Sequence, residues 1–274
     1  MTHVTPTTLP DLYDQMSNII KRNIPNALTC SNLISGCIAT CFAFIGDAKM
    51  ALIWILAGAT FDFFDGMSAR FLKVSSPIGK ELDSLADCVT FGVAPSTMIF
   101  YELTVIDYPS FLTTPEAFSF DPYRTFIPFL AFLMAAFSAL RLAKFNIDTR
   151  QTDSFIGLPT PANALFWGSL IVTSPAWLEN NAGSLAYILA LLLLSCYLLV
   201  SEIPMFALKF KNFKWQGNAI RHSFIIFTAV VLVTFGVLKG WWIVIASYFL
   251  ISLGLLLTGR SKITKMNHDK EQKL

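Results

Sequence analysis

The chain is organised as long apolar runs separated by short polar segments. Runs such as 186–200 are almost continuously apolar rather than alternating. Several runs approach 20 residues, enough to cross about 30 Å of hydrocarbon as a helix. Only helices or closed barrels satisfy their backbone in lipid, and continuous hydrophobicity favours helices. The pattern predicts an all-α polytopic membrane protein with about eight transmembrane helices, near residues 24–46, 48–71, 82–104, 124–146, 161–178, 184–202, 220–238 and 241–258.

Composition agrees with this pattern. Hydrophobic residues make up 54% of the 274 positions and charged residues only 14%, whereas soluble domains are about 25% charged. The five cysteines lie in apolar runs and form no CxxC pair. We therefore expect small core residues, and neither a disulfide framework nor a zinc site.

The segment before the first run has its own pattern. Apolar residues between Leu9 and Arg22 recur at helical spacing with polar residues between them. This spacing predicts an amphipathic helix on the membrane surface, although a solvated tail is the alternative. The expected organisation is an interfacial segment at 1–22, six helices at 23–202, two further helices at 203–258 and a basic tail at 259–274.

The distribution of basic residues predicts orientation. With a cytoplasmic N-terminus and eight spans, 17 of the 20 lysines and arginines fall on the cytoplasmic side. Such asymmetry is what the positive-inside rule requires. We therefore expect a multi-pass protein of the cell membrane with both termini in the cytoplasm.

Four aspartates, Asp62, Asp65, Asp83 and Asp87, interrupt the apolar pattern on the cytoplasmic side. Each acid costs roughly 2.5–3.5 kcal/mol at membrane depth, and the nearby Arg70 cannot neutralise all four. The first pair shares one helical stripe with Gly66, Ala69 and Arg70, and the second pair lies one turn beyond Gly79. Antiparallel helices joined by residues 72–80 would bring the two stripes together.

This acid cluster favours a hard divalent cation, Mg²⁺ or Mn²⁺. Two such ions could hold a pyrophosphate as it is cleaved. Small side chains at Gly66 and Ala69 leave room for a phosphorylated ligand, and Arg70 can donate to phosphate oxygens. The alternative is that the acids form interfacial ion pairs with Arg70, Lys73 and Lys80, which leaves the helical spacing of all four unexplained.

The spacing resembles the signature of the CDP-alcohol phosphatidyltransferase family, with eight fixed positions over 26 residues: Asp62-x2-Asp65-Gly66-x2-Ala69-Arg70-x8-Gly79-x3-Asp83-x3-Asp87. The segments 24–29, 82–95, 141–146 and 157–162 are similar to blocks of its phosphatidylserine synthase branch. The resemblance covers roughly residues 20–165.

The resemblance implies a six-helix core at 23–202 in a usually homodimeric enzyme. Such an enzyme transfers a phosphatidyl group from CDP-diacylglycerol, within membrane lipids, to L-serine. A nucleic-acid partner is not expected. Asp62, Asp65 and Asp83 would bind metal, and Asp87 would be the general base and also lie near the metal. The CDP-diacylglycerol site would include the following residues: Asp65, Gly66, Ala69, Arg70, Gly79, Asn26 and Thr29.

Serine carries a carboxylate, so its pocket needs a cation. Arg141 and Lys144 lie in the cytoplasmic layer, and Asn146 and Thr160 can supply hydrogen bonds. Ordinary interfacial anchoring explains the two cations equally well. For Asn26, Thr29 and Asn32 the alternative to nucleotide binding is interhelical hydrogen bonding.

Two other functions stay open. Phosphatidylglycerophosphate synthase, or another member of the family, would use a different acceptor alcohol. Met67 stands where many phosphatidylserine synthases carry a basic residue, which weakens the branch assignment slightly. A divalent cation transporter would distribute its acids over several spans near the midplane, whereas here they gather near one membrane face.

Overall fold

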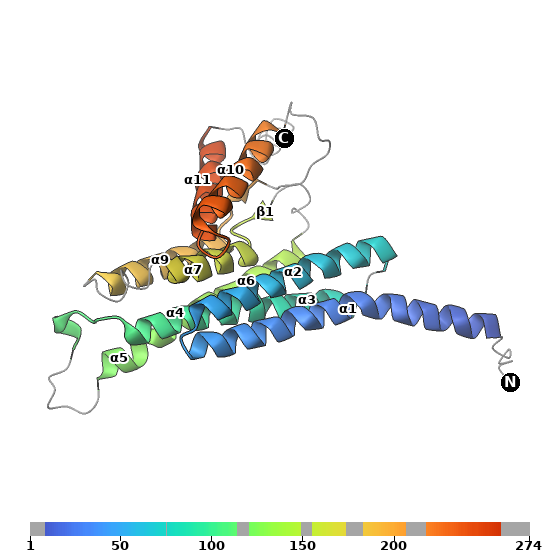
Figure 1. Ribbon diagram of the computed structural model, residues 1–274, viewed down its shortest axis with the longest axis horizontal. Helices are drawn as coiled ribbons and strands as arrows, with labels where there is room; N and C mark the ends of the chain where they lie inside the picture. The colour runs from blue at the N-terminus through green and yellow to red at the C-terminus, as the bar shows by residue number, and fades with distance from the viewer. Residues whose placement is uncertain are drawn as a thin grey trace, which may run out of the picture.

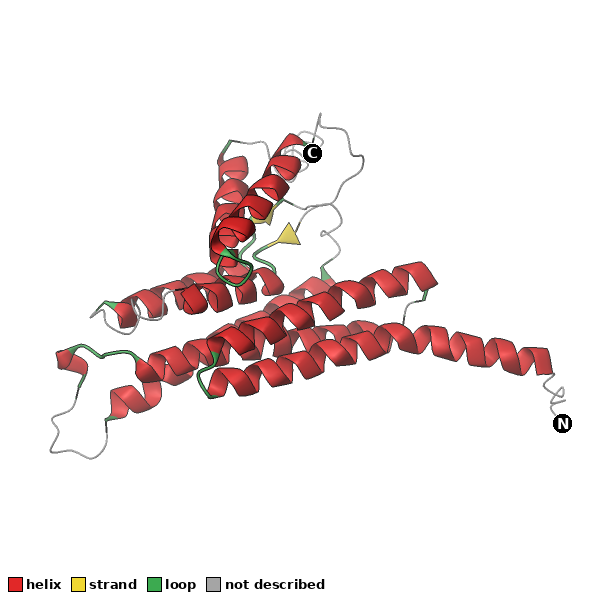
Figure 2. Ribbon diagram, viewed as in Figure 1, coloured by secondary structure: helices red, strands yellow, loops and turns green. Residues whose placement is uncertain are grey.

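The computed structural model describes residues 9–74, 76–113, 121–148, 155–173, 183–206 and 218–258. Side chains are described from Lys21 onward within these ranges, except Arg22 and Phe155. Helices dominate the described chain, and the strands are limited to one short pair (Figure 2).

The helices and strands have the following bounds: α1 Leu9–Phe44, α2 Ala48–Leu72, α3 Pro77–Asp87, the π-helix η1 Cys88–Val93, α4 Ala94–Val105, the 3₁₀ turn η2 Ser110–Leu112, α5 Pro122–Phe126, the 3₁₀ segment η3 Ile127–Phe132, α6 Leu133–Ile147, β1 Phe155–Ile156, α7 Thr160–Thr173, α9 Ser184–Val200, β2 Pro204–Met205, α10 Ala219–Phe235 and α11 Trp241–Leu257.

The first helices run side by side along the long axis of the molecule (Figure 1). Helix α1 packs against α2, α3 and α4, and α7 packs against α2 and α11. The turn between α1 and α2 is tight because Gly46 adopts a positive φ of 80°. Asp47 then caps α2, and its Oδ1 accepts a hydrogen bond from the Met50 backbone N–H at 2.9 Å. Helices α10 and α11 cross the bundle at a steep angle (Figure 1).

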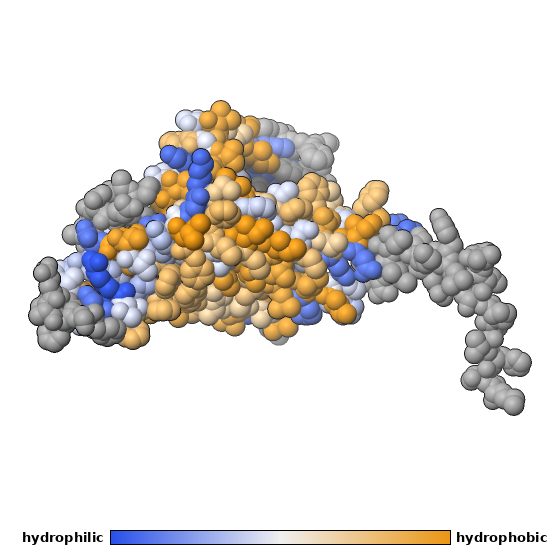
Figure 3. All heavy atoms as spheres, turned by 60° about the horizontal axis from the view of Figure 1, so that its bottom comes forward, coloured by the Kyte–Doolittle hydropathy of each residue, from blue (hydrophilic) through white to orange (hydrophobic). Residues whose placement is uncertain are grey.

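Within the part of the chain that the structure describes, four helical segments are long and apolar enough to span a membrane: Asn23–Phe44, Ala48–Leu72, Pro77–Val105 and Pro122–Ile147. The helices α9, α10 and α11 are apolar but shorter, with 17 residues each, or about 25 Å. Apolar side chains cover the middle of the bundle face in Figure 3, with polar ones toward its ends. The all-α polytopic fold is thus confirmed.

The boundaries differ from the sequence prediction at two places. Helix α1 continues from Leu9 through Pro25 into the first span without interruption, so the expected surface helix is not a separate element. Its position on a membrane surface stays a prediction. The third span begins at Pro77, five residues earlier than expected, which places Gly79 inside the same helix as Asp83. The predicted basic tail at 259–274 lies outside the described residues.

Buried apolar residues form two clusters. The larger one lies between the helices of the main bundle and includes Leu52, Phe91 and Trp167. The smaller one joins α10 and α11 to the strand pair and includes Met205 and Tyr248. The two-residue strands β1 and β2 are antiparallel. No repeat or alternation predicted them, because two residues are too short for a periodic signal.

The prediction that the cysteines are core residues is wrong for helix α1. Cys30, Cys37 and Cys41 are exposed, Cys88 is half-buried, and only Cys196 is buried. Residues on an apolar helix are equally compatible with lipid and with protein, so composition does not separate the two environments.

Candidate active site

The hairpin of α2 and α3 brings the two aspartate pairs together. Lys73 ends α2 in the left-handed conformation, with a φ of 54°. Ser76 then caps α3, its hydroxyl oxygen accepting a hydrogen bond from the Gly79 N–H at 2.9 Å. Pro77 at the first turn of α3 fits because its missing N–H would have no helical partner.

Three of the four aspartates converge. Carboxylate oxygens of Asp62, Asp83 and Asp87 all lie within 4.8 Å of one another. Asp87 is buried, and the other two are half-buried. The predicted meeting of the α2 and α3 acids is therefore confirmed as geometry, with one residue from α2 and two from α3.

The donor set fits a divalent cation. Among the described residues, no lysine or arginine nitrogen lies within 4.0 Å of these three carboxylates. The buried Oδ1 atom of Asp83 also has no hydrogen-bond partner. Carboxylate oxygens gathered in this way are ligands of hard cations.

Asp65 stands apart from that group, since its Oδ2 accepts a hydrogen bond from the Thr29 hydroxyl of α1 at 2.6 Å. A second polar residue of α1, Asn32, donates from Nδ2 to the Oδ1 atom of Asp87 at 3.0 Å. Helix α1 therefore reaches both sides of the acid cluster. The interhelical reading of Thr29 and Asn32 is confirmed as geometry.

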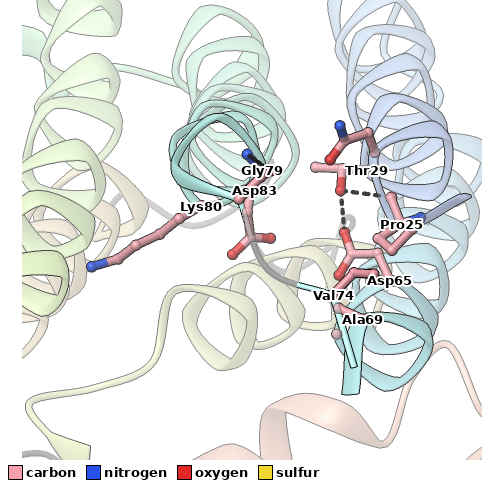
Figure 4. A pocket seen from close by; sticks show the side chains of 11 residues that line it. Pro25, Thr29, Asp65, Ala69, Val74, Gly79, Lys80 and Asp83 are labelled. Atoms are coloured by element: carbon pink, nitrogen blue, oxygen red, sulfur yellow. Dashed lines mark hydrogen bonds between the residues drawn. The ribbon is translucent and has the colours of Figure 1, made fainter. Parts of the chain in front are cut away.

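A cavity of about 210 Å³ opens beside the acids. Its walls come from α1, α2 and α3, with Thr29 and Asp65 facing Asp83 across it (Figure 4). The lining residues are Pro25, Asn26, Thr29, Asp65, Gly66, Ala69, Val74, Ser76, Gly79, Lys80 and Asp83. Six of the seven residues expected at the nucleotide site are therefore part of one cavity wall.

The seventh residue, Arg70, is exposed and does not line this cavity. It shares the helical stripe of Asp62 and Gly66, as its spacing predicts. However, it lies in the last turn of α2, so its long side chain can extend past the bundle into solvent.

Of the residues expected around serine, Arg141 is the most enclosed, with 8% of its surface exposed. Its guanidinium carbon lies 5.3 Å from the centre of the Phe145 ring, and it interacts electrostatically with Asp87 and Tyr248. Among the described residues, no carboxylate oxygen lies within 4.0 Å of its nitrogens.

The other three residues of that group have different surroundings. Lys144 is exposed. Asn146 donates from Nδ2 to the hydroxyl oxygen of Ser84 at 2.8 Å, which ties α6 to α3. Thr160 is fully buried, and its hydroxyl has no hydrogen-bond partner.

Sequence reasoning missed four lining residues: Pro25, Val74, Ser76 and Lys80. The sequence held a spacing signal for Ser76 and Lys80. Ser76 precedes Gly79 by three residues and Lys80 by four, and Lys80 precedes Asp83 by three, which are the intervals of one helical face. The side chain of Lys80 extends away from Asp65 and Asp83 (Figure 4). Its Nζ donates a hydrogen bond to the Asn146 carbonyl at 2.7 Å.

The part of the chain that carries these residues is similar to known proteins. The family model described as CDP-alcohol phosphatidyltransferase matches residues 22–201. The CDP-diacylglycerol–serine O-phosphatidyltransferase of Bacillus subtilis is 39% identical over 139 residues, covering 50% of this chain and 69% of the relative. The protein of the same name from Helicobacter pylori is 32% identical over 196 residues, covering 70% and 74%. The archaetidylserine synthase of Methanothermobacter thermautotrophicus is 29% identical over 153 residues, covering 55% and 58%.

Proposed function

The chain belongs to the CDP-alcohol phosphatidyltransferase family, and from this premise we propose that it transfers the phosphatidyl group of CDP-diacylglycerol to the hydroxyl of L-serine and releases CMP. The observation that carries the proposal is the convergence of Asp62, Asp83 and Asp87 beside a cavity within the region that matches the family. The names of the Bacillus and Helicobacter relatives support serine as the acceptor.

The cavity suits the nucleotide end of a lipid substrate. Gly66, where an added Cβ would meet no atom within 4 Å, and the small side chain of Ala69 leave its wall open, and Asn26 and Thr29 supply polar groups. The exposed apolar side chains Phe63, Phe64 and Met67 lie on the same helix as Gly66. A substrate with its acyl chains in lipid and its cytidine diphosphate in the cavity would contact both the exposed apolar side chains and the polar cavity wall.

Asp62, Asp83 and Asp87 would hold divalent metal, whereas Asp65, also expected as a ligand, lies outside this group and is hydrogen-bonded to Thr29. Bound metal supplies positive charge that stabilises the diphosphate oxygens as negative charge develops on the leaving CMP. The proposal does not depend on whether the ion is Mg²⁺ or Mn²⁺, or on whether one or two ions bind.

Asp87 is proposed as the general base. Serine's hydroxyl is a weak nucleophile at neutral pH, so a positioned carboxylate must accept its proton during attack. The serine oxygen forms a bond to the phosphorus that carries diacylglycerol, the bond from that phosphorus to the CMP oxygen breaks, and CMP leaves. Asn32 occupies one oxygen of Asp87, which leaves the second oxygen for the proton.

Arg141 is proposed to hold the carboxylate of serine. It is a buried cation within electrostatic range of Asp87, and a serine carboxylate bound to it would direct the hydroxyl of serine toward that base. Guanidinium and carboxylate groups form paired, charge-assisted hydrogen bonds. We give Lys144 no part in this pocket, because it is exposed. Asn146, which is already bonded to Ser84, and Thr160 are assigned weaker roles.

Several further features belong to the same proposal. The protein is a homodimer of the cell membrane with cytoplasmic termini, and its acid cluster faces the cytoplasm. The core comprises 23–202, and 203–258 forms an added helical pair. The distribution of lysine and arginine supports this orientation.

The test is an acceptor comparison with purified protein in detergent–lipid micelles. CMP release from CDP-diacylglycerol is measured with Mn²⁺ or Mg²⁺ and either L-serine or glycerol 3-phosphate. We expect serine-dependent release with phosphatidylserine as the lipid product. Release that depends on glycerol 3-phosphate instead would assign the chain to phosphatidylglycerophosphate synthesis. Metal flux into liposomes without CMP release would support the transporter alternative.

A further inference from the structure

The span that carries Asp83 and Asp87 changes its helical form directly after Asp87. Residues Cys88–Val93 form the π-helix η1, and the Ala94 N–H donates to the Val89 carbonyl five residues earlier. Pro95 follows and has no N–H to donate. Such wider turns are frequent at functional sites, and here the wider turn begins beside the proposed base.

Asn32 of α1 contacts this junction through two groups. Its side chain Nδ2 donates to Asp87 Oδ1 at 3.0 Å, and its backbone carbonyl accepts a hydrogen bond from the Thr90 hydroxyl at 3.0 Å. Asn32 and Thr90 are both fully buried. When Asp87 is ionised, as a base must be, the amide nitrogen is the group that faces it, because an amide oxygen there would oppose a second acceptor. The two bonds therefore fix one carboxylate oxygen and the turn that follows it.

Two glycines allow η1 to come this close. A Cβ on Gly36 of α1 would lie 2.8 Å from the Thr90 Cα and would also overlap its hydroxyl oxygen. A Cβ on Gly58 of α2 would lie 2.5 Å from the Thr90 methyl and 2.9 Å from Asn32 Oδ1. Since Gly58 lies one turn before Asp62, the contact sits directly beside the acid cluster.

The Thr90 bond is not the default for a hydroxyl in this span. Ser96 and Thr97 each bond a carbonyl four residues earlier in their own helix, which is the usual solution in apolar surroundings. Thr90 instead donates to another helix, to the backbone of the residue that contacts Asp87. The hydroxyl thus links the π-turn to the base.

We propose that Asn32 and Thr90 are positioning residues that hold the Asp87 carboxylate in the orientation needed to accept the proton of the acceptor hydroxyl. The proposal rests on the proposed role of Asp87. Neither residue needs to touch substrate, because Asn32 acts on the carboxylate and Thr90 acts on Asn32. The expected signature is a loss of turnover with substrate binding retained.

Three variants at two threonines test this arrangement. Thr90→Val keeps the side-chain shape and removes the hydroxyl, and Thr90→Ser keeps the hydroxyl. Thr97→Val is the matched control, since Thr97 is equally buried but bonds only its own helix. For each protein we would measure kcat, the KM of both substrates, and the rise in melting temperature that CDP with Mg²⁺ produces.

We expect Thr90→Val to lower kcat roughly tenfold, in line with the rate losses that small misplacements cause. Both KM values and the CDP-dependent rise in melting temperature should stay within error of the original protein. Thr90→Ser and Thr97→Val should turn over normally. The proposal is overturned if Thr90→Val has normal kcat, if Thr90→Ser is impaired to the same extent, or if the loss lies in KM.

Asn32→Leu removes the donor itself and should lower kcat by roughly 100-fold. If this variant does not fold, the Thr90 pair decides the question. Failure of the proposed function is recognised separately, because the unaltered protein would then use another acceptor or none. If the protein uses another acceptor, the kcat of each variant is compared with that of the unaltered protein for that acceptor. If no acceptor gives turnover, the positioning role of Asn32 and Thr90 is overturned together with the role of Asp87 as base.

Discussion

Gly66 offers a clean separation of ligand binding from folding. It lies inside α2, lines the cavity, and has no heavy atom within 4 Å of the position that a Cβ would occupy. Its φ is not in the positive region that favours glycine. The fold therefore gives no reason for a glycine here, and the remaining reason is space for a ligand. The perturbation that tests this is Gly66→Ala.

Gly66→Ala is expected to maintain or raise thermal stability and to lower activity. Alanine in a helix interior is more favourable than glycine by roughly 0.5–1 kcal/mol, so the melting temperature should stay constant or rise by about 2 °C. A methyl group in the space of the bound substrate should cost about 1–3 kcal/mol, or 10- to 200-fold in kcat/KM for CDP-diacylglycerol. A variant that is more stable and less active would locate the nucleotide beside Gly66.

The assay compares CMP release and thermal unfolding for three proteins. Gly254→Ala is the matched control, since Gly254 is an exposed glycine inside α11 with equally open surroundings. It should gain the same stability and keep full activity. If Gly66→Ala retains the kcat/KM of the unaltered protein, the nucleotide does not occupy this wall of the cavity, and the reasoning is refuted.

Three other predictions concern the groups around the cavity. Arg141→Gln should raise the KM for serine at least about tenfold, the equivalent of one charge-assisted hydrogen bond, and leave the KM for CDP-diacylglycerol unchanged. Lys144→Gln, at an exposed position, should change neither KM. Equal effects of the two substitutions would exclude a specific carboxylate site at Arg141. Chelation of divalent metal by EDTA should abolish CMP release, and added Mn²⁺ or Mg²⁺ should restore it; full activity in EDTA would contradict the metal role of the acids. Thr29→Val removes the 2.6 Å hydrogen bond to Asp65 and should destabilise the protein by about 1.5–3 kcal/mol, measured as a lower melting temperature. Thr29→Ser keeps the hydroxyl and should retain the stability of the unaltered protein. If the two variants melt at the same temperature, the hydrogen bond does not contribute to stability.

The helical architecture was accessible from the sequence because each span needs only length and hydrophobicity. The meeting of Asp62 with Asp83 and Asp87 was also accessible, since helical spacing and a short connection leave few other arrangements. Glycine and alanine on the same stripe correctly predicted an open wall, at Gly66 and Ala69.

The rest depends on tertiary contacts that no local pattern encodes. The π-turn after Asp87 is accommodated by close contacts of Thr90 with Gly36 and Gly58, which are remote in sequence. Arg70 has the right spacing for the cavity, but its place in the last turn of α2 leaves it exposed. Lys80 was counted as an interfacial charge, although it lines the cavity and bonds α6.

The central claim is that Asp87 acts as the base in a metal-dependent transfer to serine. The most direct measurement is serine-dependent CMP release by the unaltered protein and by Asp87→Asn, with CDP-diacylglycerol and saturating Mn²⁺. Asparagine keeps the side-chain size but accepts no proton, so turnover should fall by roughly 100-fold or more, the usual contribution of general base catalysis. Turnover by Asp87→Asn close to that of the unaltered protein would contradict the assignment.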